Sequence, residues 1–155
     1  MLPILTLILF SFAAGIFATL SALERKLYPL MLNRVVPEKE IRSVQQILAS
    51  VVNILPPTMM VVLFGSGILI LVQIFTGDLG EMTWLIAGIY AAFLIVIFQR
   101  LFPTIAAVKT TDPINGPIEE VRPLTRETII IHHIGFALSV VMMLLYAVAI
   151  RVHSA

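Results

Sequence analysis

The chain contains no cysteine among its 155 residues and carries little charge of either sign. Without cysteine it cannot form a disulfide, a thiolate metal site, a cysteine nucleophile or a c-type haem attachment. Ten Lys and Arg residues against nine Asp and Glu residues give a net charge of +1, with no dense basic run. We therefore expect no nucleic-acid partner, because binding to phosphate backbones requires concentrated positive charge.

The chain is instead rich in apolar residues. They make up 59% of the chain, charged residues make up 12%, and the mean hydropathy is +1.04. A soluble domain averages about 45–50% apolar and about 25% charged residues. Four stretches are long and apolar enough to cross a bilayer, which takes roughly 20 residues of helix. The sequence therefore predicts an all-α, integral membrane four-helix bundle that forms a single domain over residues 1–155.

The first apolar stretch is expected to be a retained helix rather than a removable signal peptide. It has no basic segment before it, its apolar run is longer than a signal peptide needs, and the charged residues Glu24, Arg25 and Lys26 follow it. We expect the four membrane helices at about 2–23, 37–76, 82–107 and 126–151.

Nine of the ten basic residues are expected on one side of the membrane. These nine residues lie from the end of the first predicted helix to the start of the second, or from the end of the third to the start of the fourth, and only Arg151 lies at the far end of the fourth. Cytoplasmic segments are enriched in Lys and Arg. The sequence therefore predicts a multi-pass protein of the cell inner membrane with both termini non-cytoplasmic (N-out, C-out). The nine residues are Arg25, Lys26, Arg34, Lys39, Arg42, Arg100, Lys109, Arg122 and Arg126.

The segment from Pro37 to Leu55 has the pattern of an amphipathic helix, with apolar residues at helical spacing and charged residues on the opposite side. We expect this cytoplasmic helix to continue into the second membrane helix, with a kink at Pro56 and Pro57, because each proline removes a backbone donor. The alternative is an independent helix on the membrane surface. The segment 108–123 contains three prolines and a glycine and is expected to be an irregular loop, with Thr125 as the N-cap of the fourth helix.

Small residues recur on each predicted membrane helix and are expected to mark its inward face, because small side chains let helices approach closely in lipid. Ordinary helix packing is one explanation of these residues, and a cavity that admits a ligand is the other. They are Ser11, Ala14, Ala18 and Ser21 on the first helix, Gly65 and Gly67 on the second, Gly88 and Ala92 on the third, and Gly135 and Ser139 on the fourth.

Polar residues gather at the predicted cytoplasmic ends of the helices. His132 lies three residues before Gly135 and seven before Ser139, so it shares their face. A polar pocket at the cytoplasmic interface is one interpretation, and the alternative is that these side chains reach out to headgroups and water. The candidate ligand-binding residues are Glu24, Asn53, Gln99, Arg100 and His132.

The sequence assigns no cofactor firmly; haem and quinone are the two candidates for such a pocket. A haem held by two histidines is not expected, because His132 and His153 are 21 residues apart, about 30 Å along a helix, and the adjacent His132 and His133 point in different directions. One axial histidine with a methionine or with another chain's histidine stays open. No metal site is expected, because no spacing motif brings several ligands together.

Several features have a family likeness: the segment Glu24-Arg-Lys-Leu-Tyr-Pro, the run ILPPTMMVVLFGSGILIL, Trp84 after a short hairpin, and Gln99-Arg100 at a helix end. The chain resembles small bacterial membrane proteins of four or five helices of the copper-resistance D-like, HemJ-type protoporphyrinogen-oxidase and anthrone-oxygenase-like groups. HemJ-type enzymes carry a His in the first helix and a Lys in the helix after the Trp. This chain has neither, so the resemblance implies no catalytic residues for it.

Two functions are consistent with these features. The first is a small accessory or structural subunit, surrounded by the lipid bilayer and packed in a homo-oligomer or a larger membrane complex. The alternative is a membrane-embedded enzyme or redox protein that binds a hydrophobic, quinone-like or porphyrin-like molecule in the polar pocket. A transporter is disfavoured, because the middle of every predicted helix is uncharged.

Overall fold

The computed structural model describes residues 1–153, and within them the chain is helical apart from short turns. Over this part of the chain, four helical stretches are long and apolar enough to cross a membrane. These stretches confirm the predicted all-α membrane bundle and a multi-pass protein. They are Leu2–Met31, Leu55–Thr76, Met82–Thr110 and Ile118–His153.

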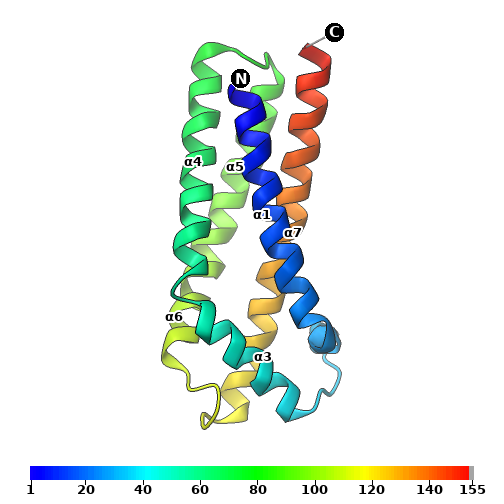
Figure 1. Cartoon of the computed structure of the whole chain (residues 1–155), viewed down its shortest axis with the longest axis vertical. Helices are drawn as coiled ribbons and strands as arrows, with labels where there is room; N and C mark the ends of the chain where they lie inside the picture. Colours follow the sequence, from blue (N-terminus) through cyan, green and yellow to red (C-terminus); the bar gives the residue numbers. More distant parts are fainter. Residues whose placement is uncertain (154–155) are drawn as a thin grey trace.

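The four long helices form a closed ring. Helix α1 (Leu2–Glu24) packs against α7 (Ile118–His153) and α4 (Leu55–Thr76), and α5 (Met82–Val96) joins α4 to α7. Both termini lie at the same end of the bundle as the hairpin between α4 and α5, and we call this the termini end (Figure 1). The opposite end carries α3 (Glu38–Val51) and the loop before α7.

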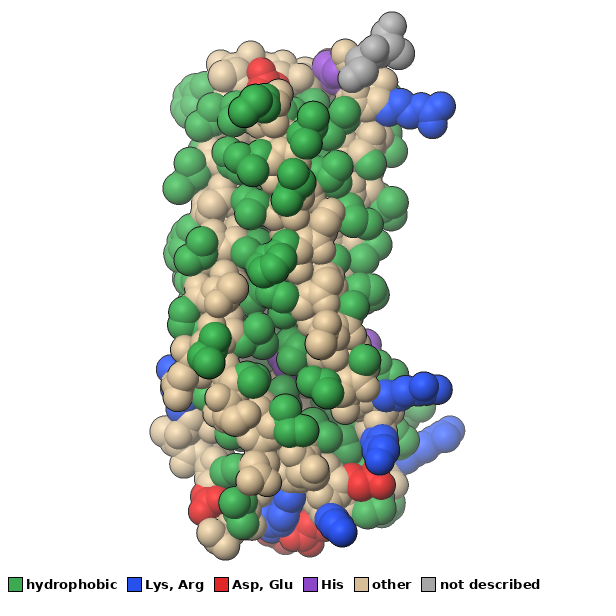
Figure 2. Space-filling model, in the orientation of Figure 1, with side chains coloured by type: hydrophobic (Ala, Val, Ile, Leu, Met, Phe, Trp, Pro, Cys, Tyr) green, Lys and Arg blue, Asp and Glu red, His purple; other side chains and the backbone are tan. Residues whose placement is uncertain are grey.

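The side chains divide by chemistry along the long axis. On the face drawn in Figure 2, hydrophobic side chains cover the middle of the molecule, while most Lys and Arg side chains gather at the end opposite the termini, here called the basic end. Trp84, at the start of α5, is 67% exposed. An apolar girdle between polar ends is the surface that a membrane-spanning protein presents to lipid.

Helix α1 leads into a short helical cap at the basic end. A 3₁₀ turn (η1, Arg25–Leu27) and a single turn of α-helix (α2, Tyr28–Met31) follow it directly. Pro29 stands in the first turn of α2, where a missing N–H costs no helical hydrogen bond. The chain then reverses at Asn33, whose positive φ of 56° is tolerated by Asn better than by most residues.

Helices α3 and α4 are separate, so the predicted single helix with a kink at Pro56 and Pro57 is wrong. The chain leaves the helix at 52–54, and the two prolines occupy the second and third positions of α4. In a continuous helix the carbonyls of Val52 and Asn53 would accept hydrogen bonds from residues 56 and 57. Proline has no N–H to donate, so the helix opens where those two carbonyls lie.

The third membrane stretch contains a π-helix. Helix α5 passes into η2 (Ile97–Leu101), a π-helical segment, and then into α6 (Phe102–Thr110). Pro103 accounts for this distortion, because it cannot donate to the carbonyl of Gln99 and its ring crowds that carbonyl. The stretch therefore continues past the predicted end at 107 with a local widening around Arg100.

Helix α7 begins at Ile118, two turns before the predicted start near 126, so the irregular loop is only 111–117. Pro123 lies inside the helix, near its N-terminus. Glu119 and Glu120 stand in the first turn, where negative charge is favoured by the helix dipole. Thr125, predicted as the N-cap, instead lies in the helix and donates to the carbonyl of Val121.

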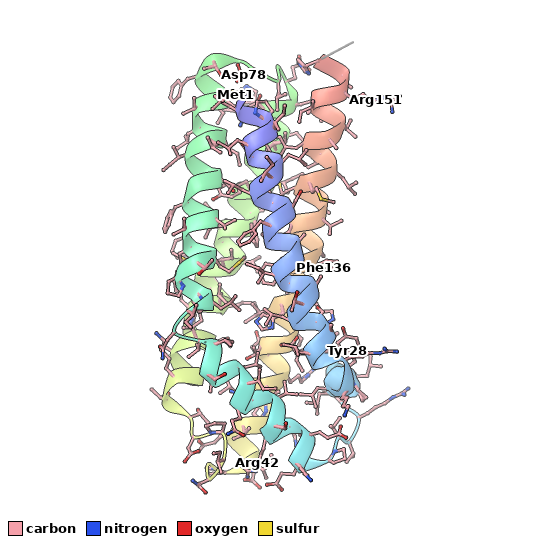
Figure 3. The ribbon with its side chains drawn as sticks, viewed as in Figure 1. Met1, Tyr28, Arg42, Asp78, Phe136 and Arg151 are labelled. Carbon is pink, nitrogen blue, oxygen red and sulfur yellow. The ribbon has the colours of Figure 1, made fainter. Side chains whose placement is uncertain are left out.

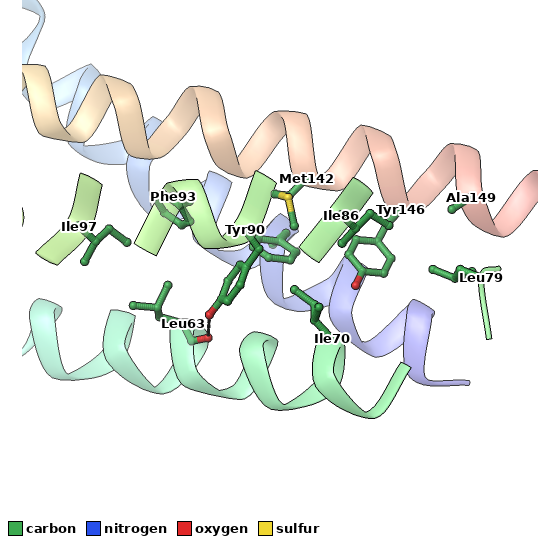
Figure 4. Close-up of a cluster of buried hydrophobic side chains, with 11 residues drawn as sticks. Leu63, Ile70, Leu79, Ile86, Tyr90, Phe93, Ile97, Met142, Tyr146 and Ala149 are labelled. Atoms are coloured by element: carbon green, nitrogen blue, oxygen red, sulfur yellow. Dashed lines mark hydrogen bonds between the residues drawn. The ribbon is translucent and has the colours of Figure 1, made fainter. Parts of the chain in front are cut away.

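Large side chains, not small ones, form most of the inward faces. A buried cluster in the termini half combines Phe10 from α1, Leu63 and Ile70 from α4, and Tyr146 from α7 with an inward row on α5 (Figure 4). The Tyr90 hydroxyl donates to the carbonyl of Leu63. The inward row on α5 is Thr83, Ile86, Tyr90 and Phe93, followed by Ile97 at the start of η2.

The predicted small-residue face is wrong on α5, where Gly88 and Ala92 are exposed, and right on α7. On α1 it is right only in part, because Ala14 is buried while Ser11 and Ala18 are exposed. The two glycines predicted on α4 are half-buried. On α7 Gly135 is buried against the Phe17 ring, and a Cβ atom at Gly135 would collide with that ring. The bundle therefore packs aromatic side chains of α1 against small residues of α7.

Candidate functional site

A buried histidine and a buried carboxylate meet between α1 and α7. His132 Nδ1 lies 2.6 Å from Glu24 Oε1, and the Glu24 side chain has no exposed surface. The ring nitrogen is the donor in this bond when the carboxyl is ionised, which leaves Nε2 as the nitrogen that His132 can offer to another molecule. Burying a carboxylate is costly unless it is paired, so this contact offsets part of that cost, while the buried Oε2 of Glu24 has no hydrogen-bond partner among the described residues.

His132 also lies on the wall of an internal cavity of about 110 Å³. All four membrane stretches contribute to the wall, together with the end of α3. The wall is apolar, with Phe, Leu, Ile, Val and Met side chains, apart from a few polar residues. These are Ser66, Arg100, Thr104, Thr128, His132 and Ser139.

The cavity is closed toward the termini end by two phenylalanines and two serines. Following each helix along its direction, the wall residues nearest the termini are Phe10 on α1, Ser66 on α4, Phe93 on α5 and Ser139 on α7. Ser66 is 0% exposed and Ser139 is 1% exposed. Neither serine hydroxyl has a hydrogen-bond partner among the described residues.

Toward the basic end, aliphatic side chains of the α3–α4 turn and of the π-helical segment line the wall beside Arg100 and Thr104. Leu55 and Pro56 on one side and Leu101 and Ile105 on the other are half-buried, so they reach both the cavity and the molecular surface. An apolar molecule could extend along these side chains without leaving apolar surroundings.

The structure brings together two of the five predicted site residues and places a third at the cavity wall. Glu24 and His132 are hydrogen-bonded. Arg100 lines the cavity, but its carboxylate partner is Glu127 at 3.2 Å rather than Glu24, and the Arg100 side chain is 47% exposed.

The other two predicted residues lie outside the cavity. Gln99 is exposed and does not line the cavity, because the inward face of this stretch is the one that carries Phe93 and Ile97. Asn53 is exposed in the turn between α3 and α4 and borders an open groove beside Lys109. These two predictions are therefore wrong.

Ser66 and Ser139 were missed as polar groups of the site, although both stood in stretches noted for small residues. Their signal in the sequence is weak, because a serine among glycines and alanines also fits ordinary helix packing. The hydroxyl becomes informative only when the fold buries it without a partner.

A second buried polar cluster, in the termini half, is fully paired. Gln73 Nε2 donates to Thr6 Oγ1 at 2.9 Å, and the Tyr146 hydroxyl donates to Gln73 Oε1 at 3.1 Å. All three side chains are completely buried. This cluster links α1, α4 and α7 and leaves no group for a ligand, so we assign it to bracing of the bundle.

At the basic end, Arg42 fastens α3 to the loop before α7 (Figure 3). Its guanidinium donates to the carbonyls of Ile114 and Gly116, and its Nε donates to Glu38 at 2.7 Å. Within the loop, the backbone N–H of Ile114 and then that of Asn115 donate to Asp112, which holds the pKa of the Asp112 carboxyl below its ordinary value.

No three His, Asp or Glu side chains between residues 1 and 153 come together in a way that could hold a metal ion. The chain has no match among family models, curated proteins or solved structures. The resemblance to small bacterial membrane proteins of the HemJ-like and related groups therefore stays a prediction, and the cavity itself is the basis for a functional proposal.

Proposed function

We propose that this chain binds a hydrophobic small molecule inside the bundle, with the polar head of that molecule at His132. The observation that carries the proposal is the internal apolar cavity with His132 in its wall, held from behind by the buried Glu24. Ligand sites in proteins are typically apolar hollows with a few well-placed polar groups.

The size of the cavity favours a single ring over a macrocycle. Its volume is about 110 Å³, and an engineered apolar cavity of about 150 Å³ in another protein binds benzene. A porphyrin is several times larger than one ring, and the wall offers only one histidine as an axial ligand. Of the two cofactors considered from the sequence, quinone is therefore supported over haem.

The His132–Glu24 pair supports a ligand with a hydrogen-bonding head. Glu24 fixes the ring orientation of His132 through Nδ1, so Nε2 is presented in a defined direction. A neutral imidazole accepts a hydrogen bond from a hydroxyl at Nε2, and an imidazolium donates one to a carbonyl. The same nitrogen can therefore hold either a phenolic or a quinonoid oxygen.

We place the site in the cytoplasmic half of an inner membrane, with both termini non-cytoplasmic. This orientation is supported by the nine basic residues that the sequence places on one side, against Arg151 alone on the other. The lipid-soluble ligand would reach the cavity from the membrane along the half-buried aliphatic residues beside Leu55 and Leu101.

A role as an accessory subunit of a homo-oligomer or larger membrane complex, expected from the sequence, stays a prediction. The exposed apolar side chains fit lipid and protein neighbours equally well.

The proposal is tested by binding of para-cresol, a single ring with one hydroxyl, to the protein in lipid nanodiscs. With ¹⁵N-labelled histidine, we expect para-cresol to shift the ring nitrogen signals of His132 in a saturable way. Ala13 lines the cavity and is buried, so Ala13→Leu should fill space there and abolish the shift.

The matched control is Ala92→Leu, because Ala92 is exposed on α5 and does not line the cavity. This variant should bind para-cresol as the parent protein does. Unchanged His133 signals in Ala13→Leu would show that its bundle is intact. An equal His132 response in both variants, or no response in the parent protein, would overturn the proposal.

A further inference from the structure

The two buried serines at the closed end of the cavity are unusual among the hydroxyl groups of this chain. Most Ser and Thr hydroxyls in its helices donate to a carbonyl of the preceding turn, as is usual where water is scarce. Ser66 and Ser139 do not, and their oxygens have no partner among the described residues. The hydroxyls that do bond in this way include those of Thr6, Ser11, Thr19, Thr58, Thr104, Thr125 and Thr128.

The position of Ser66 and Ser139 on the cavity wall is as informative as their lack of a hydrogen-bond partner. Ser21 and Thr83 also have buried hydroxyls without a partner, but neither residue lines the cavity. Ser66 and Ser139 come from opposite helices, α4 and α7, and both lie on the wall at the end of the cavity nearest the termini. A buried hydroxyl without a hydrogen-bond partner costs free energy of folding unless a molecule in the cavity forms a hydrogen bond with it.

The spacing of His132 and Ser139 along α7 sets the size of a ligand that could hydrogen-bond to both. His132 and Ser139 both face the cavity and are seven residues apart, which is about 10 Å along a helix. When both side chains extend straight from the helix, a ligand that spans this rise with a hydrogen bond of about 2.8 Å at each end has its two polar atoms about 5 Å apart. That separation matches the two oxygens at opposite corners of one six-membered ring.

We propose that the ligand is a single ring of the hydroquinone or para-quinone class, with one oxygen at His132 and the other at the hydroxyls of Ser66 and Ser139. This assignment rests on the proposed function and adds the second anchor. A serine hydroxyl both donates and accepts hydrogen bonds, so it can hold a ring hydroxyl or a ring carbonyl. Phe10 and Phe93, which also close this end, provide the apolar contact for the ring.

Para-xylene, para-cresol and hydroquinone test the second anchor, because they share one ring and similar size but carry no, one and two hydroxyl groups at opposite corners. Dissociation constants are measured in nanodiscs by the shifts of labelled histidine. We expect hydroquinone to bind roughly tenfold more tightly than para-cresol, the gain from one further hydrogen bond. Para-xylene should leave the Nε2 signal of His132 unchanged.

The double variant Ser66→Ala, Ser139→Ala should remove the advantage of hydroquinone and leave para-cresol binding as it was. Its melting temperature should not fall, because neither hydroxyl gives up a hydrogen bond within the protein. The control is Ser11→Ala, whose hydroxyl is exposed and donates to Leu7, and it should keep the advantage.

The outcomes separate this inference from the proposed function. If para-cresol binds at His132 but hydroquinone binds no better, or if the double variant keeps the advantage, the second anchor is wrong and the proposed function stands. If the double variant melts at a lower temperature, the serines brace the bundle and the inference is overturned. If neither para-cresol nor hydroquinone reaches His132, both proposals fail.

Discussion

Some buried polar side chains in this bundle have hydrogen-bond partners within the protein, and others have none among the described residues. Thr6, Gln73 and Tyr146 satisfy one another across three helices, so they hold the termini half of the bundle in one arrangement. Ser66 and Ser139 are equally buried but unpaired, and both line the cavity. The contrast indicates that the first cluster stabilises the fold, while the second is better explained by binding.

The Glu24–His132 pair should contribute strongly to stability as long as both partners are present. Removing one partner of a buried pair leaves the other unsatisfied, so we expect Glu24→Ala to lower the free energy of unfolding by about 3–5 kcal/mol. His132→Ala should cost a similar amount, and the double variant should cost clearly less than the sum. Denaturant titration of the helical circular dichroism signal in detergent measures all three.

The exposed pair of Arg100 and Glu127 is the control for that cycle. With side chains 47% and 34% exposed, this ion pair is screened by solvent, and Glu127→Ala should change stability by at most about 1 kcal/mol. Strict additivity of the Glu24 and His132 variants would mean that the 2.6 Å contact carries no coupling free energy, contrary to our account of the site.

The membrane helices were predictable from sequence, and the joints between them were not. Hydropathy alone locates the spans, because a bilayer requires about 20 apolar residues. The start of α7 at Ile118 was missed because Pro117 and Pro123 were interpreted as loop residues. Pro117 only precedes the helix, but Pro123 is its sixth residue, where a proline removes a helical hydrogen bond, so the sequence pattern argued against a helix there. Likewise, Pro56 and Pro57 marked the correct joint, but the break lies in the turn just before them.

The site was only partly predictable, for a physical reason that concerns helix faces. On α7 the polar His132 and the small Gly135 fall on one face, and that face is buried. On α5 every face is apolar, so the sequence gives no indication of which one turns inward. Small residues suggested the side of Gly88, whereas the ring of Tyr90 occupies the interior. The prediction of Gln99 failed together with that choice of face.

The α3–α4 joint yields a prediction about its two prolines. Because Pro56 and Pro57 stand in the first turn of α4, where N–H groups have no helical partner in any case, replacing both with alanine should not remove any hydrogen bond. We expect the double variant to insert normally and to melt within a few degrees of the parent protein. Electron-paramagnetic-resonance distances between labels on α3 and α4 should lengthen, because residues 56 and 57 could then donate to the carbonyls of Val52 and Asn53 and the helix could continue through 52–54.

A proline placed later in the same helix is the control. Met60→Pro lies in the second turn of α4, where it removes a helical hydrogen bond and crowds the preceding turn, at a cost of about 3 kcal/mol or more. Unchanged label distances in the Pro56→Ala, Pro57→Ala variant would mean that the turn at 52–54, and not the two prolines, holds the joint open, contrary to our account of that joint.

Charge and cavity are both asymmetric along the long axis of the molecule. The closed end of the cavity lies toward the termini end, and its half-buried aliphatic wall residues lie toward the basic end. Arg42 ties α3 to the loop before α7 at that same end. The orientation of the chain in the membrane therefore decides from which leaflet a lipid-soluble ligand would reach His132.

The orientation is tested by single cysteines in this cysteine-free chain. Asp78, in the hairpin at the termini end, and Ile114, in the loop at the basic end, are both exposed. In the proposed orientation, which puts the basic end in the cytoplasm, a membrane-impermeant maleimide should label Asp78→Cys in cells whose outer membrane has been permeabilised. Ile114→Cys should react only after the inner membrane is opened with detergent, which also serves as the control for its reactivity. The opposite pattern would invert the topology and move the ligand's access route to the outer leaflet, while reaction of both sites in closed cells would contradict a single orientation.

Exchanging Arg25, Lys26 and Arg34 for glutamine should weaken the preference for this orientation, because orientation follows the distribution of Lys and Arg rather than the fold of the bundle.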